Sequence, residues 1–280
     1  MLDPNARFLH GSTMSHVTRM TVTGMLGLTF MFVVDLANLF WISRLGDERM
    51  VAALGFAWNV QFFSISVGIG LMIAATALVS KAIGQGRREE ARRFATGCMA
   101  LGVCLQALVA ILIVMFRSKI IAFTGATGET ALLAERFLLI SVPTLPLMAI
   151  GMIGSAILRS EGDAYRAMFV TMSAGLVAVV ADPILIIWFE LGLDGAAINT
   201  GLSRLVSTSI AIWSVIRVHN LLGGLTLSII KVAFIPFLII ALPAILTQLS
   251  GPFASFIITR AIAEFGDSAV AGLSVVNRLS

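Results

Sequence analysis

Two acidic residues, Asp35 and Asp182, lie well inside long apolar stretches of the chain. The rest of its 15 Asp and Glu residues fall in loops, at the ends of such stretches or in the N-terminal tail. A carboxylate at the centre of a bilayer costs about 2.5–3.5 kcal/mol on insertion scales, so it normally faces a cavity or a partner. Two isolated acids in so apolar a chain therefore predict a site that exchanges a proton or a small cation.

The neighbours of each acid leave a second interpretation open. Asn38 follows Asp35 by one helical turn, so Asp35 could be a structural acid bonded to Asn38 or to another helix. Pro183 follows Asp182 and removes a backbone donor, which tends to kink a helix and to free a carbonyl group. That carbonyl could serve as a ligand, or Asp182 could merely fill the hydrogen-bond gap at a packing kink.

The composition decides the class of protein. Of 280 residues, 58% are hydrophobic and 12% are charged, whereas soluble domains are about a quarter charged. The apolar runs are long and continuous, so we expect an all-α polytopic membrane protein rather than a barrel. Cys98 and Cys104 are expected to be small core residues. No Gly-Lys-Ser/Thr phosphate loop is present, which counts against a nucleotide-driven pump.

The order of apolar and polar segments predicts four regions. Residues 1–19 form a polar arm, 20–216 a six-helix transmembrane bundle, 217–231 an amphipathic connector, and 232–280 span seven with part of span eight. Alternating the loops places eleven Lys and Arg residues on the side of the N-terminus and six on the other side. By the positive-inside rule, the arm and the connector are cytoplasmic. The expected location is the cell (inner) membrane.

A short internal repeat supports this division. The turn Gly46-Asp47 is followed by Val51-Ala52-Ala53-Leu54, and the turn Gly266-Asp267 by Val270-Ala271-Gly272-Leu273. Six spans separate the two copies, so they have the same orientation. This indicates a parallel six-plus-six repeat, an arrangement known in transporters. The chain would then hold the first bundle and an incomplete second one.

Four stretches together resemble the multidrug and toxic compound extrusion (MATE) family of cation antiporters. They are Val34-Asp35 with the turn at Leu45-Gly46, Gly84-Gln85-Gly86, 158–163, and Asp182-Pro183 with 192–197. The resemblance implies two six-helix bundles, a cavity between them, and export of amphiphilic or cationic compounds against protons or sodium. It implies contact with membrane lipid, no enzymatic reaction, no cofactor beyond the coupling ion, and neither nucleotide nor nucleic acid as a partner. The missing second bundle is expected from the rest of the chain or from another chain.

The resemblance also assigns roles to single residues. By this resemblance, Asp35, Asp182 and Thr200 are expected to bind the proton or cation. Separately from the resemblance, Asn38 and Ser155 are expected to contact substrate. The family often has Asn four residues before the acid of span five, where this chain has Ala178, and this difference favours protons over sodium. One family branch uses an acid inside span seven, whereas here Glu264 stands at its end.

We therefore predict a secondary antiporter in which Asp35 and Asp182 exchange the coupling ion and the substrate. Two alternatives remain: a flippase for a lipid or a lipid-linked glycan, and a truncated fragment that transports nothing. A flippase would need several cations facing its cavity, and only Arg204 and Arg278 are candidates. Arg204 could neutralise a carboxylate, or it could extend to the outer interface.

Overall fold

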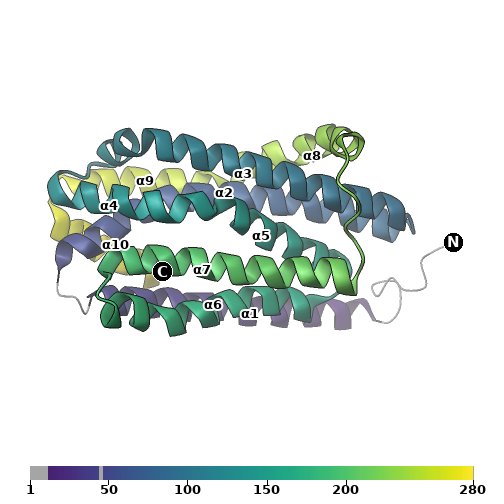
Figure 1. Cartoon of the computed structure of the whole chain (residues 1–280), viewed down its shortest axis with the longest axis horizontal. Coiled ribbons are helices and arrows are strands. Elements are labelled where there is room, and N and C mark those ends of the chain that lie inside the picture. The colour runs from purple at the N-terminus through teal and green to yellow at the C-terminus, as the bar shows by residue number, and fades with distance from the viewer. Residues whose placement is uncertain (1–11, 44–46, 280) are drawn as a thin grey trace.

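The computed structural model describes residues 12–43 and 47–279. Within these ranges the chain is helical and contains no strand (Figure 1). Six described helical segments are long and apolar enough to cross a membrane: Met14–Asn38, Glu48–Gly84, Arg88–Thr124, Gly128–Ser160, Ala164–Trp188 and Leu227–Ala263. The predicted class, an all-α polytopic membrane protein, is confirmed.

The helices are α1 Thr13–Ser43, α2 Glu48–Gly84, α3 Arg88–Thr124, α4 Gly128–Ser141, α5 Leu145–Ser160, α6 Ala164–Pro183, α7 Gly192–Trp213, α8 Leu227–Gln248, α9 Ser250–Ala263 and α10 Asp267–Leu279. A 3-10 turn at Val142–Thr144 joins α4 to α5 within one span, and π-helical turns at Ile184–Trp188 and Ser214–Val218 extend α6 and α7. The 22-residue α7 is long enough to cross a bilayer, which takes about 20 residues. It carries the polar side chains Asp194, Asn199 and Arg204.

Most helices extend beyond the apolar stretches that mark them in the sequence. The first helix begins at Thr13, inside the predicted arm of residues 1–19. The predicted connector of residues 217–231 is helical at both ends, because a π-helical turn reaches Val218 and α8 begins at Leu227. Polar end residues explain the difference, because a helix continues as long as its end groups find partners. Asp47, for example, accepts a hydrogen bond from the Arg49 amide at 2.9 Å and caps α2.

Helix α2 occupies the centre of the molecule and packs against α3, α4, α5 and α8. Helices α1, α6 and α7 lie side by side along one flank (Figure 1). The beginning of the predicted second bundle, α8, rests on α2 and α3. Glycines allow this close approach, since a Cβ added at Gly70 would stand 2.8 Å from the Ile245 amide nitrogen of α8.

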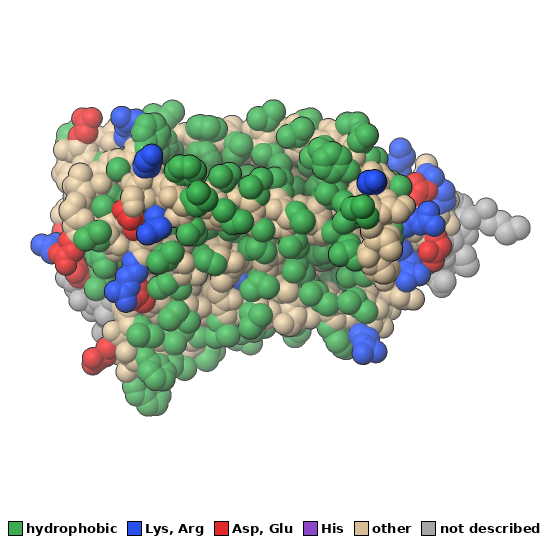
Figure 2. Space-filling view, turned by 45° about the horizontal axis from the view of Figure 1, so that its top comes forward, with side chains coloured by type: hydrophobic (Ala, Val, Ile, Leu, Met, Phe, Trp, Pro, Cys, Tyr) green, Lys and Arg blue, Asp and Glu red, His purple; other side chains and the backbone are tan. Residues whose placement is uncertain are grey.

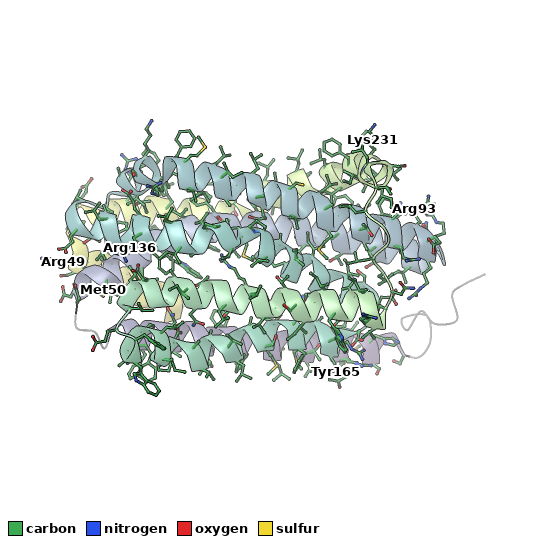
Figure 3. The ribbon with its side chains drawn as sticks, in the orientation of Figure 1. Arg49, Met50, Arg93, Arg136, Tyr165 and Lys231 are labelled. Atoms are coloured by element: carbon green, nitrogen blue, oxygen red, sulfur yellow. The ribbon has the colours of Figure 1, made fainter. Side chains whose placement is uncertain are left out.

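The surface agrees with a membrane-embedded helix bundle. Charged side chains gather at the two ends, and a hydrophobic band separates them (Figure 2). Arg93 and Lys231 lie at one end, and Arg49 and Arg136 at the other (Figure 3), which is the grouping obtained by alternating the loops. Cys98 is buried as expected, but Cys104 is exposed, because it lies on a face of α3 that no described helix covers.

A buried carboxylate ties the segments together at the end that carries Arg93. Asp163 is 2% exposed, accepts a hydrogen bond from the Arg166 amide at 3.2 Å, and pairs with the Arg166 guanidinium. His219 Nε2 lies 3.0 Å from its Oδ2 atom. Arg88 donates to the His219 carbonyl at 2.9 Å. The α5–α6 turn, the start of α3 and the segment after α7 are thereby joined.

This cluster predicts a pH-dependent loss of stability in Asp163→Asn. Burial by itself would raise the pKa of Asp163, but its hydrogen bonds to Arg166 and His219 and the Arg166 charge lower it below its ordinary value. Because its pKa is lowered, Asp163 stabilises the fold at every pH above its unfolded-state pKa of about 3.9. This contribution is lost as the pH falls through the folded-state pKa. We expect Asp163→Asn to cost about 1–3 kcal/mol at pH 7.

Thermal unfolding in detergent from pH 7 down to about pH 2 measures this effect. The melting temperatures of wild type and Asp163→Asn should stay apart down to about pH 4 and converge below it. The control is Glu129→Gln, whose ion pair with Arg49 is exposed on both sides and should contribute little. A constant difference at every pH would show that the charge of Asp163 plays no part.

Candidate cation site

Asp182 lies at the end of α6, is fully buried at 0% exposure, and is bonded to two asparagine side chains. The Asn38 Nδ2 atom of α1 donates to Oδ2 at 3.0 Å, and the Asn199 Nδ2 atom of α7 donates to Oδ1 at 2.5 Å. Each carboxylate oxygen therefore receives an amide donor from a different helix. One acidic side chain links three helices inside the bundle.

The end of α6 fixes the position of this carboxylate. Pro183 provides no backbone N–H, and a π-helical turn follows it at Ile184–Trp188. The chain then reverses through Gly192, whose φ of 52° is in the left-handed region. The next helix returns so closely that a Cβ at Gly195 would stand 2.7 Å from the Leu185 carbonyl oxygen. This contact sets α7 against α6 and brings Asn199 to Asp182.

Small residues also seat α1 on α6. A Cβ at Gly175 would lie 2.7 Å from a ring carbon of Phe30 and 2.9 Å from a methyl group of Val34. Asn38 follows Val34 by one turn on α1, and Asp182 follows Gly175 by two turns on α6. The close contact at Gly175 therefore lets the short Asn38 side chain reach the carboxylate.

Oxygen and amide groups of this kind suit a proton or a hard monovalent cation. The Asn199 side chain also donates to the Ala178 carbonyl at 3.0 Å. Its own oxygen, Oδ1, is buried and has no hydrogen-bond partner within the described part of the chain. An amide oxygen beside a carboxylate is a typical ligand of hard cations, which prefer oxygen ligands. No group of three or more His, Cys, Asp or Glu residues that could hold a metal was found in residues 12–43 and 47–279.

The structure brings together only part of the predicted set. Asn38 and Asp182 are in contact, whereas the Thr200 hydroxyl bonds the Ala196 carbonyl of its own helix at 3.0 Å. Ser155 lies at the other end of the bundle, where its hydroxyl is 3.4 Å from the Ala167 carbonyl. Ala167 precedes Asp182 by 15 residues, or about 22 Å along α6. The Asp35 side chain lies outside the described residues.

Asn199 is the site residue that the sequence interpretation missed. The expected amide at position 178 is absent, but Asn199 reaches the backbone at that position from α7. The sequence did contain one signal for it, because Asn199 places an amide side chain inside an apolar span directly before Thr200. The shell around Asp182 therefore contains the kind of group whose absence had favoured protons over sodium.

Comparison with protein families decides the affiliation of this helix bundle. The family model MatE matches residues 24–184, which include α1, the centre of the bundle and Asp182. The chain belongs to the MatE family. The MATE resemblance seen in the sequence is thus confirmed, and proteins of this family are multi-pass membrane transporters.

Individual MATE relatives are similar over most of this chain. An FAD transporter of Shewanella oneidensis is 28% identical over 266 residues, which are 93% of this chain and 59% of that protein. The multidrug export protein MepA of Staphylococcus aureus is 24% identical over 91% of this chain and 57% of its own length. The chain thus spans somewhat more than half the length of these relatives.

Solved MATE structures share the fold. The crystal structure of MATE in the bent conformation has a TM-score of 0.80 at 26% identity, covering 91% of this chain and 58% of that one. The inward-facing conformation of a MATE family transporter has a TM-score of 0.79 and covers 94% of this chain and 61% of that one. An outward-facing conformation has a TM-score of 0.78 and covers 99% of this chain and 67% of that one. Both are 24% identical to this chain, so they show the fold alone.

Proposed function

We propose that this MATE protein is a cation-coupled antiporter that exports amphiphilic small molecules in exchange for protons or sodium. The observation that carries the proposal is the buried Asp182 carboxylate, which accepts amide hydrogen bonds from α1 and α7. Intramembrane acids are expensive and usually functional. Inside an apolar span, an uncharged side chain could join the same helices at a lower cost than a carboxylate.

The proposed mechanism follows from what an ion does to these contacts. The ionised carboxylate accepts both amides and holds α1 and α7 against α6. A proton or a sodium ion on Asp182 competes with the Asn38 and Asn199 amides for the same oxygen atoms. Because the ion binds the two arrangements of α1 and α7 with different affinity, its gradient shifts the population between them. Substrate release on one side and ion entry on the other are then coupled.

The class of cargo and the orientation of the protein in the membrane complete the proposal. One relative is named for FAD and another for multidrug export, so organic molecules are the expected cargo class. We place the protein in the cell (inner) membrane with Arg93 and Lys231 at the cytoplasmic end, because the more basic loops face the cytoplasm. Asp35 is proposed as a second ion-exchanging acid on α1.

Everted vesicles that carry the protein test this function. A fluorescent amphiphile is followed under an imposed pH gradient and then under a sodium gradient. We expect gradient-dependent accumulation in one of the two conditions, and that condition identifies the coupling ion. Vesicles without the protein provide the background rate. If neither gradient accelerates uptake above this background, coupled antiport is excluded.

A further inference from the structure

A second polar cluster surrounds Arg204, on the opposite side of α7 from Asn199. Its Nη1 atom donates to the Ser141 carbonyl at 2.9 Å and to the Thr144 hydroxyl at 2.8 Å. Its Nη2 atom donates to Gln61 Oε1 on α2 at 2.9 Å. Gln61 in turn donates to the Ser141 hydroxyl at 2.8 Å. The side chain thus bridges α7 to α2 across the break between α4 and α5.

The depth of Arg204 excludes one of the two interpretations offered by the sequence. It lies 12 residues after Gly192, or about 18 Å along α7 from the start of the helix, near the middle of the span. A side chain at this level does not extend to the interface, and its nitrogen atoms bond groups of α2 and of the α4–α5 break instead.

The three groups that accept hydrogen bonds from Arg204 are all neutral. Within the described residues, no Asp or Glu oxygen lies within ion-pair distance of its guanidinium. Buried charges are normally paired, because a lone cation in a low-dielectric interior is costly. The positive charge held at mid-span therefore lacks a counter-charge from the described side chains.

The guanidinium also retains donors for another partner. It has five N–H groups, and the hydrogen bonds above use two on Nη1 and one on Nη2. Nε–H and one N–H of Nη2 remain as donors, and a guanidinium binds a carboxylate or a phosphate through two parallel hydrogen bonds. The side chain is partly exposed. Gln61, Ser141 and Thr144 hold the group in a fixed orientation without neutralising it.

We propose that Arg204 binds an anionic group, a carboxylate or a phosphate, of the transported amphiphile. This inference rests on the proposed transport function and adds molecules that carry a negative charge to its cargo. Arg204 follows Asn199 by five residues, about 7.5 Å along the same helix. The anion site and the cation site would therefore act on one rigid element, α7, which links cargo binding to the ion on Asp182.

A structural role for Arg204 predicts different results. Pro143 and Pro146 break the helix near Ser141, and Arg204 could simply hold this break against α7. Its loss would then impair every cargo equally and lower the melting temperature. An anion site predicts instead a loss that depends on the charge of the cargo.

The test compares wild type, Arg204→Gln and Arg204→Lys in everted vesicles, with Arg217→Gln as the control for an exposed cation near the end of the same span. The cargoes are an organic cation dye, a carboxylate dye of similar size, and flavin mononucleotide as the phosphate. We expect Arg204→Gln to reduce the flux of an anionic cargo by roughly tenfold or more and to leave cation flux within about twofold. Comparison of the dye with the flavin identifies carboxylate or phosphate as the preferred group.

Binding to purified protein separates this proposal from the transport proposal. Fluorescence anisotropy of the same anionic cargoes should show a Kd that rises by roughly tenfold or more in Arg204→Gln and is partly restored in Arg204→Lys. Equal loss of cation and anion flux, or unchanged anion binding in Arg204→Gln, would overturn the anion site. Absence of all gradient-driven flux with charge-dependent binding intact would overturn the antiport proposal alone.

Discussion

Replacing Asp182 with Asn is expected to reduce gradient-driven efflux by about 5- to 150-fold, the range of typical coupling free energies of 1–3 kcal/mol. The Asn amide has nearly the same size as the carboxyl group, but it carries no charge and takes up no proton near neutral pH. Asn38 and Asn199 then face an amide whose state is independent of the ion. The two arrangements of α1 and α7 lose their response to the gradient. Vesicle uptake under the coupling gradient measures the loss.

Asp194→Asn is the matched control for this variant. Asp194 is close to the site in sequence, but it pairs with Arg136 at the end of the bundle. The flux of the Asp194→Asn protein should therefore remain near that of wild type. Asp35→Asn completes the series and tests the acid whose side chain lies outside the described residues. Equal flux in wild type and Asp182→Asn would remove Asp182 from the mechanism.

Gly195→Ala is expected to destabilise the protein and to impair transport, although it adds a single methyl group. The new Cβ would stand 2.7 Å from the Leu185 carbonyl oxygen and 2.8 Å from its carbon. These are backbone atoms of the π-helical turn, so no side chain can rotate away to relieve the contact. Overpacking of this kind costs about 1–3 kcal/mol. The shift of α7 would also draw Asn199 away from Asp182.

Thermal unfolding in detergent and vesicle flux together check this expectation. Gly24→Ala is the control, because a Cβ at this helical glycine meets nothing within 4 Å, and Ala in a helix is favoured over Gly by about 1 kcal/mol. Its melting temperature should therefore equal or exceed that of wild type. A Gly195→Ala protein with wild-type stability and flux would show that the α6–α7 contact is looser than described.

The sequence was sufficient for the fold and for two residues of the candidate site, Asp182 and Asn38. Hydrophobic length identified the spans, since a bilayer requires long apolar helices. Asp182 could be singled out because a carboxylate inside such a helix is costly. Hydropathy could not locate the helix ends, since α1 continues through polar residues from Thr13. Hydropathy also gave no indication that Cys104 on α3 is exposed among the described helices.

The partners of Asp182 depend on helix rotation, which the sequence does not reveal. Adjacent residues of a helix point about 100° apart, so Asn199 faces Asp182 while Thr200 bonds its own backbone. A motif that aligns Thr200 with a family position cannot tell which of the two side chains turns inward. Ser155 lies on α5 and contacts α6 near its opposite end; its distance from Asp182 likewise depends on packing that the sequence does not reveal. The hydrogen-bonded position of Arg204 likewise required the packing of α4 and α5 between α2 and α7.

Displacement of the coupling ion by substrate is the most direct measurement of the central claim, that ion and substrate share the state of Asp182. Purified protein in weakly buffered detergent solution is titrated with substrate while released protons, or displaced radioactive sodium, are counted. The proposal predicts ion release that saturates together with substrate binding in wild type and in Asp194→Asn. In Asp182→Asn the release should fall to the amount that Asp35 alone supplies, and it should be absent when Asp35 is replaced by Asn as well. Substrate binding in wild type without release of either ion would contradict it.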